Sequence, residues 1–206
     1  MRLENKNAII TGATGGIGFA TVSKYLDEGA NVMMVGRSED KLVEVHNQLG
    51  KPNNAAFCVA ESTDEIAIRD SVQKTSDTFG SVDIVIANAG TEGVVQPLVD
   101  YSVEDFNHTL IVNVTGVWLY LKYAIPHMEN QGYGSIVAVA SGAGVVGFPG
   151  LCPYSASKHA VCGMVKTACL EYGEKGIRFN ALAPGPIDNR MMKSLGTQSQ
   201  PDDPSN

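Results

Sequence analysis

A tyrosine and a lysine lie four residues apart in the second half of the chain, in the segment YSASK at residues 154–158. In a helix this spacing places both side chains on one face, one turn apart. A phenol with its ordinary pKa of about 10 is a poor proton carrier near neutral pH, and a neighbouring ammonium group lowers that pKa. Ser141 ends an apolar run, where its hydroxyl could hold a substrate oxygen beside Tyr154. Tyr154, Lys158 and Ser141 together predict proton transfer to or from a carbonyl oxygen.

A glycine-rich segment near the amino terminus, TGATGGIG at residues 11–18, separates an apolar run from a helical pattern. Glycines let the backbone approach a pyrophosphate, and a helix N-terminus offers free N–H groups and a favourable dipole. The spacing differs from the commoner G-x-G-x-x-G, so an ordinary strand-to-helix turn is the alternative interpretation. The segment predicts a dinucleotide site formed by Gly12, Thr14, Gly16, Ile17 and Gly18.

The end of the next apolar run bears on the choice of dinucleotide, because a ribose-binding residue is expected about 20 residues after the turn. The chain reads VGRS at residues 35–38, without the carboxylate that would bind the free 2′-hydroxyl of NAD. Arg37 can pair with a 2′-phosphate, and Ser38 can donate a second hydrogen bond. An ordinary solvated cation is the alternative for Arg37. We therefore expect NADP(H) to be favoured over NAD(H).

The elements that must position these residues alternate along the chain as apolar runs and helical patterns, which is typical of a parallel sheet with crossover helices. The apolar runs are nearly continuous, as expected for strands covered on both faces. Gly29 and Gly173 follow two helical segments and predict left-handed caps, and Ser102 with Asp105 predicts a helix start. The fold class is therefore predicted as α/β, a doubly wound parallel sheet with helices on both faces (Rossmann-like). The predicted strands cover residues 8–11, 31–35, 55–60, 82–87, 135–140 and 177–182, and the predicted helices cover residues 17–28, 39–49, 64–79, 103–128 and 155–172.

These motifs, in this order, resemble the short-chain dehydrogenase/reductase family over about residues 3–195. The segment T-G-x-x-x-G-I-G matches the family's cofactor turn, the segment at 88–90 its N-A-G motif, and the pair Tyr154 and Lys158 its Y-x-x-x-K motif. Asn113 falls at the position of the family's active-site asparagine. The chain departs from the family's pattern at Ala87 (usually Asn), at Glu61-Ser62 (usually Asp-Val) and at Asn189 (usually Thr).

The resemblance implies a role for each matching residue. Tyr154 would be the general acid in reduction and the base in oxidation, while Lys158 would lower its pKa and hold the nicotinamide ribose. Ser141 would orient the substrate oxygen, and Asn113 would hold a water that joins Lys158 to solvent. Hydride would pass between the nicotinamide and the substrate carbon. The further cofactor contacts implied by the family are Glu61, Asn88, Ala89, Gly90, Pro184, Gly185, Ile187 and Asn189, and a homo-oligomer (dimer or tetramer) is implied as well.

Composition sets the outer limits of this interpretation. The chain has 206 residues, 44% of them hydrophobic, and a net charge of −7 from 15 basic and 22 acidic residues. It is long enough for one core, and its acidic balance argues against nucleic-acid binding. The sequence shows no membrane-spanning run, no signal peptide and no disulfide pattern, so we expect a cytoplasmic protein. The histidines show no metal-ligand spacing, so we expect no metal site.

We predict one dinucleotide-binding and catalytic domain over residues 1–195 and a polar, mobile segment of the substrate lid over residues 196–206.

The segments expected to line the substrate pocket, residues 91–99 and 142–153, are mostly apolar, and Glu92 is their only charged residue. They favour a small, mostly apolar and uncharged secondary alcohol or ketone, because no cation offsets the desolvation of an anion. Three alternatives stay open: a reductase of 3-oxoacyl groups on a carrier, which the net charge of −7 fits poorly, a non-catalytic NADP-binding protein, and an epimerase or dehydratase.

The end of the chain departs from the family as well, since relatives normally continue with a further helix and a seventh strand. The apolar strand at residues 177–182 is therefore expected to be an uncovered sheet edge. We expect either that residues are absent from this chain or that a partner chain covers the edge.

Overall fold

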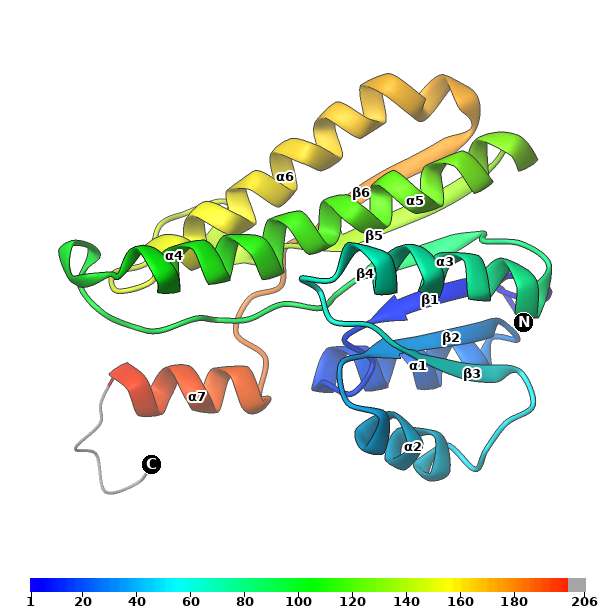
Figure 1. The fold of residues 1–206 in the computed structure, drawn as a ribbon, viewed down its shortest axis with the longest axis horizontal. Coiled ribbons are helices and arrows are strands. Elements are labelled where there is room, and N and C mark those ends of the chain that lie inside the picture. Colours follow the sequence, from blue (N-terminus) through cyan, green and yellow to red (C-terminus); the bar gives the residue numbers. More distant parts are fainter. Residues whose placement is uncertain (200–206) are drawn as a thin grey trace.

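The computed structural model describes residues 1–199 and shows a six-stranded parallel sheet flanked by helices (Figure 1). The strand order is β3-β2-β1-β4-β5-β6, and every neighbouring pair is parallel, which confirms the predicted doubly wound α/β fold. The winding reverses between β1 and β4, and ligands of open α/β sheets bind at such a point, beyond the carboxyl ends of the strands. The strands are β1 (Asn7–Thr11), β2 (Asn31–Gly36), β3 (Ala55–Val59), β4 (Ile84–Ala87), β5 (Gly134–Val139) and β6 (Ile177–Leu182).

Two helical layers bury the central strands. Side chains of α1 and α2 pack on one face, and side chains of α3, α5 and α6 pack on the other. The last helix, α7, lies apart from both layers, at the lower left of Figure 1. The helices are α1 (Gly16–Asp27), α2 (Glu39–Gln48), α3 (Glu65–Phe79), α4 (Val103–Leu110), α5 (Gly116–Gln131), α6 (Cys152–Tyr172) and α7 (Arg190–Ser199).

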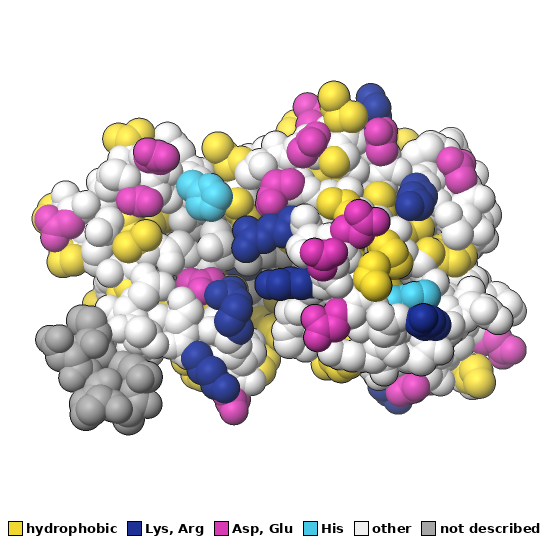
Figure 2. Space-filling model, turned by 60° about the horizontal axis from the view of Figure 1, so that its bottom comes forward, with side chains coloured by type: hydrophobic (Ala, Val, Ile, Leu, Met, Phe, Trp, Pro, Cys, Tyr) yellow, Lys and Arg dark blue, Asp and Glu magenta, His cyan; other side chains and the backbone are white. Residues whose placement is uncertain are grey.

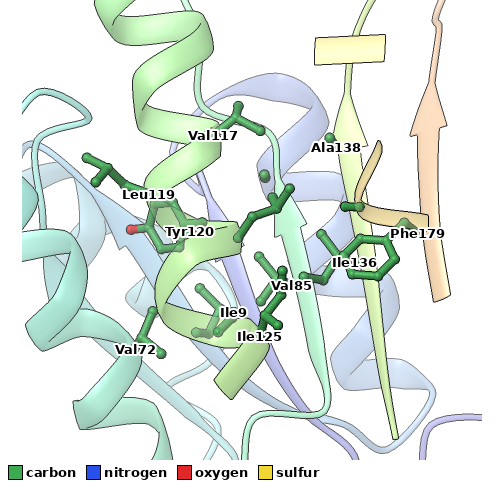
Figure 3. Close-up of a cluster of buried hydrophobic side chains, with 14 of the residues drawn as sticks. Ile9, Val72, Val85, Val117, Leu119, Tyr120, Ile125, Ile136, Ala138 and Phe179 are labelled. Atoms are coloured by element: carbon green, nitrogen blue, oxygen red, sulfur yellow. The ribbon is translucent and has the colours of Figure 1, made fainter. Parts of the chain in front are cut away.

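The larger of the two apolar clusters fixes the strands against α5 (Figure 3). Ile9, Val85 and Ile136 come from the adjacent strands β1, β4 and β5, and they lie beside Val117 and Tyr120 of α5. Alternate residues of a strand point to opposite faces, so both faces of the central strands need apolar side chains. The continuous apolar runs of the sequence follow from this burial on both sides.

The edge strand β6 differs from the central strands. Ile177 and Phe179 are buried with side chains of α6, whereas Arg178, Asn180 and Leu182 are exposed. The sequence predicts that helices cover every strand on both faces, and this prediction is wrong for β6, which is covered on one face only. Within residues 1–199, β6 forms an outer edge of the sheet, as expected.

The predicted helix at residues 103–128 is not continuous. Its start is as predicted, since the Ser102 hydroxyl accepts a hydrogen bond of 3.0 Å from the backbone N–H of Asp105. A π-helical turn at Ile111–Thr115 then separates α4 from α5. A π-turn holds one more residue per hydrogen-bonded ring than an α-helix does, and such turns are frequent at functional sites. The apolar spacing continues through the turn, so the sequence pattern did not reveal it.

Two other local predictions have opposite outcomes. Gly29 adopts the left-handed conformation expected after α1, with φ of 87°. Gly173 does not, because the chain continues from α6 into a short 3-10 helix at Gly173–Lys175, and Gly176 takes the positive φ instead. Residues 196–199 are also not a loop, since they form the end of α7. The rest of the predicted mobile segment, residues 200–206, lies outside the described residues.

Candidate active site

The predicted tyrosine and lysine share one face of α6. Tyr154 lies in the first turn of the helix, and the Lys158 ammonium nitrogen lies 5.6 Å from the centre of the Tyr154 ring. Lys158 is only 4% exposed, and its Nζ donates a hydrogen bond of 2.9 Å to the carbonyl oxygen of Val139 at the end of β5. Burial disfavours the charged amine and lowers the pKa of Lys158 to about 8. The amine is therefore held at the carboxyl edge of the sheet.

The acidity of Tyr154 differs from the expectation. Burial raises its pKa above the ordinary value, while a hydrogen bond from Ser141 acts in the opposite direction. The lowering by Lys158 that the sequence predicts is not found in this structure. Because the pKa of Lys158 is lowered to about 8, the amine loses its charge at a lower pH than Tyr154 titrates, so no ammonium remains to stabilise the phenolate.

Ser141 occupies the predicted position just after β5. Its hydroxyl accepts a hydrogen bond of 3.2 Å from the backbone N–H of Ala143, which opens a short 3-10 helix at Gly142–Gly144. It is also close enough to Tyr154 to lower the pKa of the phenol. The structure thus brings Ser141, Tyr154 and Lys158 together at the carboxyl end of β5.

Asn113 lies in the π-helical turn and is fully buried. Its side-chain oxygen accepts from the backbone N–H of Thr91 at 2.8 Å, and its amide nitrogen donates to the Thr91 carbonyl at 2.9 Å and to the Ser157 hydroxyl at 3.0 Å. Both amide N–H groups are therefore engaged. The resemblance implies a water at Asn113. Because both amide N–H groups are occupied, such a water would have to donate to an oxygen of Asn113, either that of the side-chain amide or that of the backbone carbonyl. The side chain joins the segment after β4 to α6.

The glycine-rich turn forms a tight cradle between β1 and α1. Gly12 has φ of 62°, and a Cβ atom there would lie 2.9 Å from the side-chain nitrogen of Asn88. A Cβ atom on Gly18 would lie 2.1 Å from the carbonyl oxygen of Gly12, so the turn and the helix can approach this closely only without side chains. The N-cap of α1, Gly15, supplies no side-chain hydrogen bond, and the first turn holds no acidic residue. The free N–H groups of this helix end suit an anionic phosphate, and Ile17 and Thr14 lie in the same turn.

The predicted N-A-G segment follows β4 and lies beside this cradle. The Thr11 hydroxyl accepts hydrogen bonds from the backbone N–H groups of Asn88 and Ala89, at 2.9 and 2.8 Å, and the Asn88 amide donates to the Thr11 carbonyl at 2.9 Å. The Asn88 side chain thus joins β1 to β4. A Cβ atom on Gly90 would lie 3.5 Å from Lys158 Nζ, so the absence of a side chain leaves room beside the amine.

The residues predicted to select the dinucleotide lie beyond β2 and β3. Arg37 is exposed, and within residues 1–199 it has no hydrogen-bond or ion-pair partner. The Ser38 hydroxyl caps α2 by accepting from the Lys41 N–H at 3.4 Å. Glu61 accepts from the backbone N–H of Ser62 at 3.1 Å. Figure 2 shows Lys and Arg side chains gathered around a hollow near the middle of one face of the molecule.

The segment after β6 closes the site from the other side. The Pro184 carbonyl accepts from the N–H of Gly142, and the Cβ of Asn189 lies 3.3 Å from where a Cβ on Gly16 would be. Asn189 also caps α7, because its side-chain oxygen accepts from the Met192 N–H at 3.1 Å. Next to this segment lies an open groove of about 610 Å³ that reaches none of the residues around Tyr154; its lining residues are Pro186, Ile187, Asp188, Met192, Lys193, Gly196 and Thr197.

The structure adds α7 residues that the sequence analysis did not single out. The Tyr154 hydroxyl donates to the sulfur of Met191 at 3.8 Å. Arg190 pairs with Glu92 through two hydrogen bonds of 3.0 and 3.2 Å. The available signal was weak: Asn189 is a good helix N-cap, and the polar residues that follow it have helical spacing.

Within residues 1–199, no group of three or more His, Cys, Asp and Glu side chains is arranged to bind a metal ion. Over the same residues, no helix is both long enough and apolar enough to cross a bilayer.

A parallel sheet with a glycine cradle at its switch point, and with Tyr154, Ser141 and Lys158 at its carboxyl edge, defines a dinucleotide-dependent oxidoreductase. The family model described as short chain dehydrogenase matches residues 6–200. The chain belongs to the short-chain dehydrogenase/reductase family, and it is an NAD(P)-dependent oxidoreductase that acts on CH–OH groups.

Several relatives are similar to this chain over most of their length. Short-chain dehydrogenase reductase 3a of Arabidopsis thaliana is 38% identical over 185 residues, which cover 89% of this chain and 72% of the relative. Glucose 1-dehydrogenase of Gluconobacter oxydans is 38% identical over 191 residues, covering 90% and 71%. The 3-oxoacyl-[acyl-carrier-protein] reductase FabG of Thermotoga maritima is 38% identical over 197 residues, covering 95% and 79%.

Solved structures show the same fold. The crystal structure of levodione reductase superposes with a TM-score of 0.94 at 32% identity, covering 98% of this chain and 79% of that one. NAD⁺-bound xylitol dehydrogenase superposes with a TM-score of 0.92 at 31% identity, covering 99% and 80%.

Proposed function

We propose that the protein interconverts a small, mostly apolar secondary alcohol and its ketone, with NADP(H) favoured over NAD(H) and Tyr154 as the proton donor and acceptor. The observation that supports this most is the convergence of Tyr154, Ser141 and Lys158 at the carboxyl end of β5. The dinucleotide would bind the cradle at Gly12–Gly18, where free helix N–H groups suit its phosphates, and it would supply the hydride.

Residues of the chain would transfer the proton and would position the substrate and the nicotinamide ribose. Burial keeps the Tyr154 hydroxyl protonated, which is the form that donates to a ketone oxygen during reduction. Ser141 would hold the same oxygen. Lys158, whose pKa is lowered to about 8, can exchange a proton near neutral pH and would hold the nicotinamide ribose in the room that Gly90 leaves. Oxidation needs the phenolate, so the raised pKa of Tyr154 favours reduction near neutral pH.

The proposed preference for NADP(H) rests on Arg37. Its guanidinium is exposed at the end of β2, and the Gly36 before it lies beside Thr14 of the cradle, where a Cβ atom would be 3.6 Å from the Thr14 methyl. An arginine without a partner can bind a 2′-phosphate through two hydrogen bonds. The hydroxyl of Ser38 would add one more donor.

The proposed substrate class rests on the segments around the tyrosine. Val94, Val145, Val146 and Phe148 are exposed there, which suits an apolar substrate. The structure adds one cation to this region, Arg190, but the carboxylate of Glu92 already pairs with it. An anionic substrate would have to displace that carboxylate, which disfavours phosphorylated and carboxylated compounds.

The dissociation constants of NADPH and NADH, measured on the intact chain and on Arg37→Ala, test the cofactor preference. We expect Arg37→Ala to weaken NADPH binding about tenfold or more, because a charge-assisted contact is lost, and to leave NADH binding unchanged. Arg178→Ala, at the far end of β6, is the matched control and should change neither. Equal losses for both dinucleotides would contradict the preference.

The reaction is tested by NADPH oxidation over a panel of ketones, with Tyr154→Phe for comparison. We expect neutral apolar ketones to be reduced best and Tyr154→Phe to lose a factor of about 10² to 10⁴ in turnover while still binding NADPH. Tight NADPH binding without any turnover would favour the non-catalytic protein. Preference for a 3-oxoacyl carrier substrate would favour the FabG-like alternative, and bound cofactor without net redox change would favour an epimerase or dehydratase. We further propose that the protein forms a homo-oligomer (dimer or tetramer) and that it is located in the cytoplasm.

A further inference from the structure

The helix α7 is held against the rest of the molecule by a set of polar contacts. It has no fully buried residue, and its apolar side chains Met191 and Leu195 are only half-buried, so apolar packing contributes little to its position. Three residues spaced four apart, Arg190, Ser194 and Gln198, lie on one face of α7. The Gln198 side chain accepts from the backbone N–H of Val95 at 2.9 Å, and it donates to the Gly93 carbonyl at 3.4 Å and to the Ser194 hydroxyl at 3.1 Å. This face binds the segment that follows the N-A-G motif.

The strongest of these contacts is the ion pair between Arg190 and Glu92. Two roughly parallel hydrogen bonds of 3.0 and 3.2 Å join the guanidinium to the carboxylate. The Glu92 side chain is 6% exposed and that of Arg190 is 75% exposed. Burial opposes ionisation of Glu92, but hydrogen bonds from Arg190, from the backbone N–H of Glu92 itself and from Ser194 together outweigh it and lower its pKa. Glu92 is thus a buried carboxylate whose charge is stabilised in part by α7.

The Glu92 side of the pair is rigidly anchored. The preceding residue, Thr91, is bound at both its N–H and its carbonyl by the amide of Asn113, and the Thr91 hydroxyl accepts from the Gly93 N–H at 3.2 Å. Asn113 in turn binds Ser157, one residue before Lys158. The ion pair therefore connects α7 to the same framework that holds the candidate catalytic residues.

The position of α7 has a direct consequence for Tyr154. Met191, the neighbour of Arg190, places its sulfur 3.8 Å from the Tyr154 hydroxyl. A thioether is a weak acceptor, and it takes the place at which a ketone oxygen would have to accept a proton. In this arrangement α7 covers the tyrosine, so the substrate must displace Met191.

We propose that the Glu92–Arg190 ion pair is a latch that positions α7 and Met191 over the Tyr154 hydroxyl, and that opening this latch sets the apparent affinity for the substrate. The inference rests on the proposed function for its second half, since it takes Tyr154 as the proton donor. Glu92 and Arg190 are positioning residues. When binding needs a minor open state, the apparent affinity falls by the fraction of molecules that is open.

Hydrogen exchange of the α7 amides tests the latch without any turnover. We expect Arg190→Gln and Glu92→Gln each to raise exchange over residues 190–199 roughly tenfold, because a hydrogen-bonded charge pair is lost. The double variant should exchange no faster than either single variant, and Arg178→Gln should leave α7 unchanged. Arg190 is exposed, so Arg190→Gln should fold even if Glu92→Gln does not. Unchanged exchange in Arg190→Gln, or additive effects in the double variant, would overturn the latch.

Kinetics separate the latch from a merely structural role. A loosened latch should lower KM for ketones several-fold in Arg190→Gln, most for bulky ones, and leave the dissociation constant of NADPH unchanged. Met191→Ala should lower KM in the same way, whereas Met191→Leu should not. A KM that rises or stays constant in Arg190→Gln would contradict the proposal. If the intact chain reduces no ketone at all, the proposed function fails, while the exchange experiment still decides whether the latch exists.

Discussion

The two ends of the sheet are built from the same strands but handle polar groups in different ways. At the amino end, Asp83 is 2% exposed and accepts hydrogen bonds from the Asn7 N–H at 2.9 Å and from the Ser81 and Tyr133 hydroxyls at 2.8 Å each. The Asn7 amide donates to the Phe79 carbonyl and to Ser81, and its oxygen accepts from Asn31. The side-chain polar atoms of Asp83 and Asn7 thus find their partners within the protein.

The carboxyl end leaves donors without protein partners. The first turn of α1 lacks a side-chain cap, and Arg37 has no partner among residues 1–199. Lys158 keeps an amine in a site that disfavours its charge. Groups that satisfy one another stabilise the fold, whereas unsatisfied donors at a concave edge are available to a ligand. The difference indicates that one end holds the strands together and the other binds and reacts.

The first prediction changes the carboxyl end at Lys158, the buried amine whose charge its surroundings disfavour. Lys158→Met should lower turnover about 10²- to 10⁴-fold, the range expected for a group in proton transfer. It should leave the melting temperature equal or higher, because a thioether of similar length replaces a poorly solvated amine. Steady-state assays and thermal unfolding without cofactor measure the two effects. A large loss of stability with little loss of turnover would mean that Lys158 belongs structurally with Asp83.

The second prediction concerns pH. The pKa of Lys158 is about 8 in the folded protein and 10.5 ordinarily, so both states are protonated below pH 8 and the folded protein bears the full cost of a buried charge. Between pH 8 and 10.5 the unfolded chain binds more protons, so stability rises with pH. The rise should reach at most about 3 kcal/mol. Urea unfolding of the intact chain and of Lys158→Met across this range isolates the effect, and parallel curves for the two proteins would contradict it.

Much of this architecture could be predicted from the sequence, because its signals are local. The apolar runs of β1 and β4 are continuous since helices cover both faces. The glycine turn needs Gly12 because its φ is positive, and it needs Gly18 because a Cβ atom there would collide with the backbone of Gly12. Tyr154 and Lys158 were placed together by helical spacing alone. In each case the residues that determine the geometry lie within a few positions of one another.

The missed features depend on distant partners. Arg190 and Glu92 are 98 positions apart, and no local pattern of residue types shows that their side chains meet. The bonds of Asn113 to Thr91 span 22 positions and depend on a π-turn that apolar spacing does not mark. The raised pKa of Tyr154 follows from its surroundings in three dimensions, whereas the sequence showed only the nearby lysine.

The third prediction breaks the amino end. Asp83→Asn should lower the free energy of unfolding by about 2 kcal/mol, because an amide cannot accept from all the donors that now converge on the carboxylate. Turnover and NADPH binding of the folded variant should stay within about twofold of the intact chain, since both depend on the other end of the sheet. Urea unfolding and steady-state kinetics give the two values. If Asp83→Asn kept full stability but lost activity, the amino end of the sheet would not have the purely structural role that distinguishes it from the carboxyl end.

The smallest expected effect concerns Ser38, which lies at the carboxyl end but serves the fold as well. Its hydroxyl caps α2 across a long bond of 3.4 Å, so Ser38→Ala should lower the free energy of unfolding by only about 0.5–1 kcal/mol. The O–H group can still donate while its oxygen accepts from Lys41, so a bound 2′-phosphate would gain one hydrogen bond from it. The loss of stability should therefore be larger with saturating NADPH than with saturating NADH, as thermal unfolding can measure. Equal losses with both dinucleotides would make Ser38 a structural cap that takes no part in choosing the cofactor.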